Sequence, residues 1–263
     1  MSVPSGIGET EPYAAQLVAL IGRSATQLVR KPAAPQRAEA VQRLRRQALW
    51  LIGIGAVLVV ALMFGFDATE IGLMPPRGAP SVWPARVVTD FGRDSYLIAA
   101  LAAALAVLAL AFPFVRGDAR AKLLHFAGRI EFLLFAVALP VASTEVIKYI
   151  VGRGRPFVGG KANPFNFAPF TGTQAYFSFP SAHSVAAFAL AVGAAAIWPR
   201  LRIPLFIYAV VIAASRLVLL AHHPSDVVGG TVIGIVGALA VRHWFAVRGL
   251  GFTIGENGKI VPR

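Results

Sequence analysis

Six stretches of the chain are apolar enough and long enough to cross a bilayer as helices. A helix needs about 20 residues to span a hydrocarbon core about 30 Å thick. The first, second and fourth stretches contain no Asp, Glu, Lys or Arg, whereas the other three carry isolated ones such as Glu145, Arg216 and Asp226. The six stretches are residues 47–66, 95–115, 128–150, 181–198, 203–221 and 225–247. This pattern predicts an all-α membrane protein, built as a bundle of six transmembrane helices.

The composition agrees with a membrane protein. Of 263 residues, 57% are apolar and 14% are charged, whereas a soluble domain carries about 25% charged residues. The length suits one domain. The chain contains no cysteine, which excludes disulfides and thiolate metal sites. Residues 1–46 contain no uninterrupted apolar segment like that of a signal peptide, so we expect the first spanning helix to direct insertion.

The basic residues predict the orientation of the helices. The formal net charge is +13, and most Lys and Arg residues lie in short segments that alternate with apolar stretches. Such segments face the cytoplasm under the positive-inside rule, so this charge does not indicate a nucleic-acid partner. With six spans, both termini are then cytoplasmic. Trp50, Trp198 and Trp244 fall at the cytoplasmic ends of predicted helices, where aromatic residues are enriched.

The distribution of apolar residues divides the chain into three parts. Residues 47–247 form the membrane domain, and residues 248–263 form a cytoplasmic tail. Residues 1–46 form a cytoplasmic N-terminal extension. Within it, residues 11–31 have spaced apolar positions such as Leu17, Leu20 and Leu28. They are either an amphipathic helix on the inner leaflet or a loosely ordered segment.

Three polar clusters lie at the ends of the predicted helices. The first has Lys148 and, after six residues, Arg155-Pro156. The second is Pro180-Ser181-Ala182-His183. The third has Arg216, then His222 after five residues and Asp226 after three more. The predicted topology puts all three clusters on the outer, non-cytoplasmic face of the membrane.

The cations in these clusters predict a phosphate site. Charged residues at membrane depth are costly and usually face the interior of a bundle. Lys148, Arg155 and Arg216 would repel one another in one pocket unless an anion lay between them. Phosphate supplies that charge, and arginine binds it in a bidentate fork. Ser181 begins a predicted helix, whose N-terminal N–H groups also favour an anion.

The histidines supply reactivity. If Asp226 accepts the proton of one nitrogen of His222, the other nitrogen is free to act as a nucleophile. His183 would then be the general acid that protonates the leaving oxygen. This arrangement predicts attack on phosphorus, a phosphohistidine intermediate and its hydrolysis by water. Because side chains supply the positive charge, we expect no metal and no cofactor.

The combined pattern K-x6-RP, PSxH and SR-x5-H-x3-D resembles the type 2 phosphatidic acid phosphatase (PAP2) family, including its bacterial lipid phosphatases. The resemblance covers roughly residues 47–247. It implies that His222 is the nucleophile, His183 the acid and Asp226 the orienting residue. It also implies that five residues bind phosphate, namely Lys148, Arg155, Ser181, Ala182 and Arg216. The family most often has glycine at position 182, and a methyl group there could crowd the phosphate or change the backbone angle.

The expected function is hydrolysis of a lipid phosphomonoester or diphosphate at the outer leaflet. Candidate substrates are undecaprenyl diphosphate, phosphatidylglycerophosphate, phosphatidic acid and the phosphate groups of lipid A. We expect the protein in the cytoplasmic (inner) membrane of a bacterium, surrounded by membrane lipids, with its active site facing the periplasm. Neither the substrate lipid nor the oligomeric state follows from the sequence.

Three other functions are alternatives to lipid phosphate hydrolysis. A lipid phosphotransferase could use the same pocket and pass the phosphoryl group to an acceptor lipid. A vanadium-dependent haloperoxidase binds vanadate at such a site, but those enzymes are soluble. A transporter would need polar residues along the depth of the bilayer, whereas here they gather at one end.

Several residues near the clusters have predicted supporting roles. Glu145 lies one turn from Lys148 and is expected to pair with it. His223 adjoins the proposed nucleophile and is expected either to support it or to have no role in the reaction. Arg153 and Lys161 are expected either to attract anionic headgroups or to be solvated. Glycines 229, 230, 234 and 237 are expected to allow close packing of helices.

Overall fold

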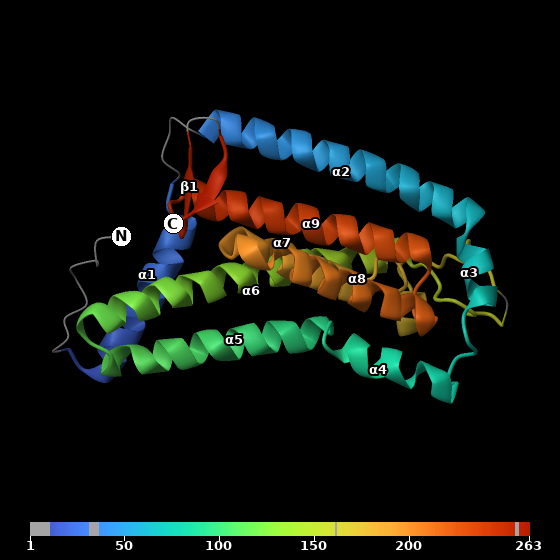
Figure 1. Cartoon of the computed structure of the whole chain (residues 1–263), viewed down its shortest axis with the longest axis horizontal. Helices are drawn as coiled ribbons and strands as arrows, with labels where there is room; N and C mark the ends of the chain where they lie inside the picture. The colour runs from blue at the N-terminus through green and yellow to red at the C-terminus, as the bar shows by residue number, and fades with distance from the viewer. Residues whose placement is uncertain (1–10, 32–36, 161, 256–257) are drawn as a thin grey trace.

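The computed structural model describes residues 11–31, 37–160, 162–255 and 258–263, most of which are helical. Long helices lie side by side along the longest axis of the molecule (Figure 1). The helices are α1 (Tyr13–Val29), α2 (Arg37–Gly65), α3 (Asp67–Leu73), α4 (Trp83–Asp90), α5 (Asp94–Ala111), α6 (Gly117–Val151), α7 (Ala182–Ile197), α8 (Arg202–Val218) and α9 (Pro224–Val247). Short 3-10 turns are η1 (Pro80–Val82), η2 (Phe112–Phe114), η3 (Gln174–Tyr176) and η4 (Pro199–Leu201), and the strands are β1 (Phe252–Ile254) and β2 (Ile260–Pro262).

Each of the six predicted apolar stretches contains a helix. In the part of the chain that the structure describes, five helical segments are long and apolar enough to cross a membrane. They are Ala38–Gly65, Pro80–Phe114, Gly117–Val151, Pro199–Val218 and Pro224–Val247. The fourth predicted stretch, 181–198, forms the shorter helix α7 of 16 residues, which spans about 24 Å at 1.5 Å per residue.

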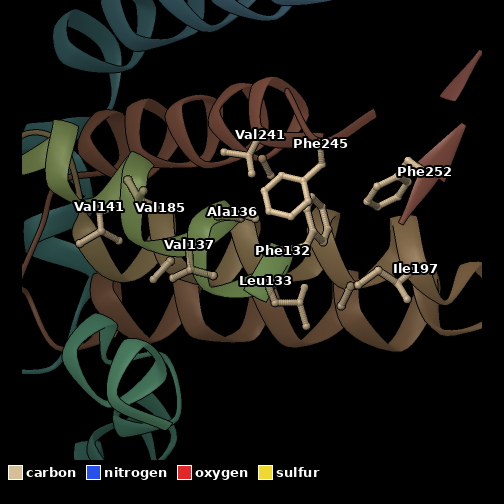
Figure 2. Packing of buried hydrophobic residues seen from close by; sticks show 14 of the residues in the cluster. Phe132, Leu133, Ala136, Val137, Val141, Val185, Ile197, Val241, Phe245 and Phe252 are labelled. Carbon is tan, nitrogen blue, oxygen red and sulfur yellow. The ribbon is translucent and has the colours of Figure 1, made fainter. Parts of the chain in front are cut away.

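Helix α7 lies at the centre of the bundle and packs on α6, α8 and α9. It is rich in alanine, and most of its side chains are buried. The main apolar core includes Val185 and Ile197 of α7, Phe132 and Val137 of α6, and Phe245 of α9 (Figure 2). The aromatic rings of Phe132 and Phe245 meet edge to face at 5.3 Å.

Small residues set how closely α9 approaches α7. A Cβ atom added to Gly230 would lie 2.5 Å from the carbonyl oxygen of Ser181, and one added to Gly234 would lie 2.4 Å from that of Val185. A Cβ atom added to Gly229 would lie 2.5 Å from the ring of Phe179, and one added to Gly237 would lie 2.3 Å from the ring of Pro140. The predicted role in close helix packing is therefore confirmed for Gly230, Gly234 and Gly237, whereas Gly229 faces a residue of the loop before α7.

Helices α2 and α5 turn apolar side chains outward. Only 6% of the most apolar window of α2 is buried, and the same holds for the segment that contains α5. Exposed residues of α2 include Ile54, Val57 and Phe64. Apolar exposure on this scale suits contact with lipid rather than water.

The two ends of the bundle differ in what covers them. Helices α3 and α4 lie at one end, and α1 and the β1–β2 hairpin lie at the other (Figure 1). The hairpin is a departure from the predicted all-α fold, and it packs on the bundle through Phe252 of β1, whose ring lies beside that of Phe132 with centroids 4.8 Å apart. Residues 256–257 lie outside the described residues.

The N-terminal extension contains a helix. Helix α1 is held to α6 by two polar contacts: Arg120 Nη2 donates to Gln16 Oε1 at 3.1 Å, and the Ser24 hydroxyl donates to Glu131. Trp244 Nε1 also donates to the Leu28 carbonyl at 3.0 Å. Contact with the inner leaflet stays a prediction, and residues 1–10 and 32–36 of the extension lie outside the described residues.

Candidate active site

The three predicted polar clusters meet at the end of the bundle that carries α3 and α4. The end of α6, the start of α7, the end of α8 and the start of α9 all lie at this end (Figure 1). The Ser181 N–H donates to the Asp226 carbonyl at 3.1 Å, which joins the starts of α7 and α9 directly. The sequence clusters are therefore neighbours in space, as the topology predicts.

A glycine turns the chain from Lys148 toward Arg155. Helix α6 ends at Gly152, which is left-handed with φ 54° and whose N–H donates to the Lys148 carbonyl. A Cβ atom here would lie 2.1 Å from the Ala168 carbonyl oxygen, so only glycine fits. After this turn, the Arg155 N–H donates to the Ala175 carbonyl at 2.9 Å.

Ser181 caps helix α7 and Ala182 is its first residue. The Ser181 hydroxyl lies 3.1 Å from that of Ser184, and both residues are fully buried. Ala182 does not have a positive φ, so its methyl group causes no backbone strain at this position. The helix start thus accepts alanine where the family most often has glycine.

The three predicted phosphate-binding cations have few anionic partners. Lys148 Nζ lies 2.7 Å from Glu145 Oε1, which confirms the predicted pair. Arg155 Nε donates to the Gln174 carbonyl at 3.0 Å, and Arg216 Nη1 donates to Thr89 Oγ1 at 2.7 Å. Among the described residues, the buried Nε of Arg216 has no hydrogen-bond partner.

These three cations act on both histidines. Lys148, Arg155 and Arg216 interact electrostatically with His183 and with His222. Their convergence brings together residues that are up to 74 positions apart in the sequence, from Lys148 to His222. Such a group of donors around two imidazoles suits binding of a phosphate dianion.

His222 is held as a neutral imidazole with one nitrogen engaged. It lies in the link between α8 and α9, only 2% exposed, and its Nδ1 is 2.7 Å from the Ser178 carbonyl oxygen. Burial, followed by Arg216, Arg155 and Lys148, holds the pKa of His222 well below its ordinary value. A carbonyl oxygen only accepts hydrogen bonds, so Nδ1 carries the proton and Nε2 keeps its lone pair.

The direct contact predicted between Asp226 and His222 is not made. Asp226 Oδ2 lies 3.9 Å from His222 Nδ1, too far for a hydrogen bond. Its oxygens are occupied elsewhere: Oδ2 accepts from the Ser178 hydroxyl at 2.6 Å and from the His223 N–H at 2.8 Å. Asp226 is therefore linked to His222 through Ser178, a residue that the motif pattern did not single out.

Arg153 is buried and ion-paired, which corrects the expectation that it attracts headgroups or is solvated. It is 1% exposed and lies between two carboxylates, with Nη1 2.6 Å from Asp226 Oδ1 and Nη2 2.8 Å from Asp67 Oδ2. Asp67 comes from α3, and the sequence analysis did not identify it. Its one signal was position, because it directly follows the first charge-free apolar stretch. Lys161 lies outside the described residues.

Two further titratable groups adjoin this network. His223 is fully buried at the N-cap of α9, and burial lowers its pKa. Glu70 of α3 is 1% exposed, and neither carboxylate oxygen has a hydrogen-bond partner among the described residues. Burial, followed by the charges of Asp67 and Asp226, raises the pKa of Glu70 to about 7. Within the described residues, no group of three His, Asp or Glu side chains could hold a metal ion.

The comparison with protein families finds one match. Residues 131–250 match the model of the PAP2 superfamily. That region runs from α6 past the end of α9, so it contains all eight residues predicted for the site.

Two curated relatives are similar over most of their length. Both are named lipid A 1-phosphatase, from Rhizobium johnstonii and Rhizobium etli, and each is 29% identical to this chain. The alignments cover 82% of this chain in both cases, and 87% and 91% of the two relatives.

One solved structure has a similar fold. It is the crystal structure of a transmembrane PAP2 type phosphatidylglycerolphosphate phosphatase from Bacillus subtilis, with a TM-score of 0.51 and 22% identity. The match covers 74% of this chain and 94% of that one. Together with the apolar helices, this likeness identifies the chain as a multi-pass membrane protein.

Proposed function

We infer that this chain is a membrane phosphatase of the PAP2 superfamily, whose model matches residues 131–250, and that it removes a phosphate group from a lipid. The observation that carries this proposal is the convergence of three cations on two histidines. Within the described residues, the single ion pair that Lys148, Arg155 and Arg216 make is the one with Glu145. A phosphate dianion bound among them would balance the remaining charge.

His222 is the proposed nucleophile. Its Nε2 lone pair attacks phosphorus, a P–N bond forms, and the P–O bond to the lipid breaks. Protonated His183 gives its proton to the leaving oxygen. His183 then takes a proton from water, whose oxygen attacks phosphorus and breaks the P–N bond. Free phosphate leaves, and both histidines return to their starting states.

The other site residues hold the phosphoryl group. Arg155 and Arg216 are proposed to donate paired N–H groups to its oxygens, and Lys148 to supply a point charge. Ser181 and the N–H groups at the start of α7, including that of Ala182, are proposed to complete the cradle. All of this charge stabilisation comes from protein donors, so we propose hydrolysis that is independent of a metal or cofactor.

Lipid A phosphate is the first substrate to test, because both curated relatives carry the name lipid A 1-phosphatase. The other candidates are undecaprenyl diphosphate, phosphatidylglycerophosphate and phosphatidic acid. A lipid phosphotransferase is the alternative outcome, since a phosphohistidine can pass its phosphoryl group to a lipid hydroxyl as well as to water.

We propose that six helices cross the inner membrane of a bacterium, with α7 as the short central span. Both termini, the extension 1–46 and the tail 248–263 are then cytoplasmic, and the site in domain 47–247 faces the periplasm. The basic residues near α1 and the β1–β2 hairpin support this orientation under the positive-inside rule.

The test is phosphate release by the purified protein in detergent, with and without EDTA. The four lipids are offered separately, beside the His222→Ala variant and the matched variant His125→Ala at the opposite end of α6. We expect one lipid to be turned over by wild type and His125→Ala, unaffected by EDTA, and not by His222→Ala. No release from any lipid would overturn the hydrolase. Release that needs an acceptor lipid would favour the phosphotransferase.

A further inference from the structure

We propose that Asp67 and Arg153 position the nucleophile, so that the α3 segment sets the orientation of His222. The inference rests on the proposed function for the identity of the nucleophile. Asp67 lies outside residues 131–250, the region that matches the PAP2 superfamily. The anchor for a residue inside the family region is therefore supplied by a segment outside it.

The Arg153 guanidinium uses all five of its N–H groups. Nε and Nη2 donate to the Pro164 carbonyl at 3.0 and 2.8 Å, and Nη2 also donates to Asp67 at 2.8 Å. Nη1 donates to Asp226 and to Ser225, both at 2.6 Å. A planar group with every donor engaged has one orientation available to it. Lysine, with three donors on a flexible stem, could not make this set of contacts.

Asp67 fixes both the cation and the turn that follows His222. Its carboxylate accepts from the Ser225 N–H at 3.0 Å and from the Ser225 hydroxyl, in addition to Arg153. Asp67, Arg153 and Ser225 are each at most 1% exposed. Because water does not compete for these contacts, the position of α3 is transmitted to the start of α9.

Two contacts carry this position to the imidazole. Asp226 accepts from the Ser178 hydroxyl at 2.6 Å, and the Arg153 carbonyl accepts from the Ser178 N–H at 3.0 Å. Ser178 is thus held from both its side chain and its backbone. Its carbonyl then accepts the Nδ1 proton of His222 at 2.7 Å. A shift of Arg153 would move that carbonyl and misdirect Nε2 from its line of attack.

The test compares Asp67→Asn and Arg153→Lys with Asp118→Asn, an exposed carboxylate at the opposite end of α6. Folding of each variant is checked by gel filtration and thermal unfolding. For Asp67→Asn we expect kcat to fall at least about tenfold with KM within about twofold, because misalignment affects the transition state and not ground-state binding. Asp118→Asn should match wild type.

Two readouts separate positioning from a loss of structure. In the double variant Asp67→Asn/Arg153→Lys, we expect a combined loss smaller than the product of the two single losses, since Asp67 acts in part through Arg153. Binding of orthovanadate, which can mimic the five-coordinate transition state, should weaken about tenfold in Asp67→Asn, while binding of inorganic phosphate is kept. If Asp67→Asn does not fold, Asp67→Glu is measured by the same criteria.

Folded Asp67→Asn with kcat and vanadate affinity within twofold of wild type would overturn the positioning role. Equal losses in KM, phosphate binding and vanadate binding would also overturn it, because they indicate general damage to the site. Wild type that releases no phosphate would overturn the proposed function instead. In that case the vanadate and phosphate affinities still decide whether Asp67 orients the site.

Discussion

Two buried polar clusters lie at the same end of this bundle and differ in how their charges are met. In one, Arg153 is placed between Asp67 and Asp226, with every donor engaged. In the other, Lys148, Arg155 and Arg216 face two histidines, and among the described residues the one carboxylate paired with them, Glu145, has a side chain 48% exposed. The first cluster is complete in the protein alone, and the second is the one that we propose is completed by a bound phosphate.

This difference distinguishes residues that stabilise the structure of the site from residues proposed to bind the substrate. Removing one partner of a satisfied buried pair leaves a charge without compensation, which costs about 3–5 kcal/mol of stability. Removing one of several neighbouring cations instead relieves repulsion, and the loss appears only when the anion binds. Stability and activity should therefore respond with opposite signs in the second cluster and with the same sign in the first.

The largest effect is expected from Arg216→Gln. We expect kcat/KM to fall by about 10³-fold, because a charged donor to the phosphoryl oxygens is lost. The melting temperature should not fall. Inorganic phosphate should raise the melting temperature of wild type and leave that of the variant unchanged. The exposed residue Arg200 provides the matched control, Arg200→Gln, which should behave as wild type. A less stable, fully active Arg216→Gln would contradict the comparison.

Asp226→Asn should reduce stability and activity together. The amide cannot pair with Arg153, and we expect a loss of about 3–5 kcal/mol in the free energy of unfolding. We also expect a fall in kcat of about 10²-fold, because Ser178 and the imidazole lose their support. Chemical denaturation and steady-state kinetics measure the two quantities. Unchanged stability would mean that the cluster is not an energetic unit.

Gly230→Ala tests the contact between α9 and the start of α7. The added Cβ would lie 2.5 Å from the Ser181 carbonyl oxygen, and we expect a loss of about 1–3 kcal/mol in stability. Activity should fall as well, since Ser181 begins the proposed phosphate cradle. The control is Gly53→Ala on α2, where no atom lies within 4 Å of the new Cβ. Its stability should rise slightly. Equal effects of the two variants would argue against the close approach.

The smallest of the four effects is expected from Glu70→Gln, which should change how the stability of the protein depends on pH. The pKa of Glu70 is raised to about 7 in the folded protein, whereas an unfolded glutamate titrates near pH 4.3. The folded state therefore holds a proton that the unfolded state has released, and stability falls as pH rises through this window. The variant lacks this slope, so its advantage in melting temperature should grow from pH 5 to pH 8. Parallel profiles would show that Glu70 ionises normally.

The sequence predicted the helices and the meeting of the three polar clusters at one end of the bundle, for different physical reasons. A helix that crosses a membrane needs an uninterrupted apolar stretch, so its position is visible directly. The cations and histidines were recognisable because charge at membrane depth is costly and needs a reason. The likeness of the motifs to a known family then assigned each residue a role, which stays a proposal until the variants are measured.

The network behind the proposed catalytic residues could not be predicted in the same way. Asp67 and Arg153 are 86 positions apart, and each follows a predicted span, where a solvated charge is equally plausible. The spacing of His222 and Asp226 suggested direct contact, but in the structure the two residues are linked through hydrogen bonds to Ser178. Its carbonyl is a backbone group, which no sequence motif identifies. The β1–β2 hairpin was missed because its strands have only three residues each.

The carbonyl of Ser178 has one further consequence for the proposed intermediate. A carboxylate beside Nδ1 could take the proton during phosphoryl transfer and leave a neutral, long-lived phosphoimidazole. A carbonyl oxygen is too weak a base to do so, and the ring keeps that proton. The phosphorylated imidazole therefore remains a cation, in which the P–N bond is activated toward cleavage by water. The choice of acceptor would make the first half of the reaction slightly harder and the second half faster, which favours turnover over storage of the phosphoryl group.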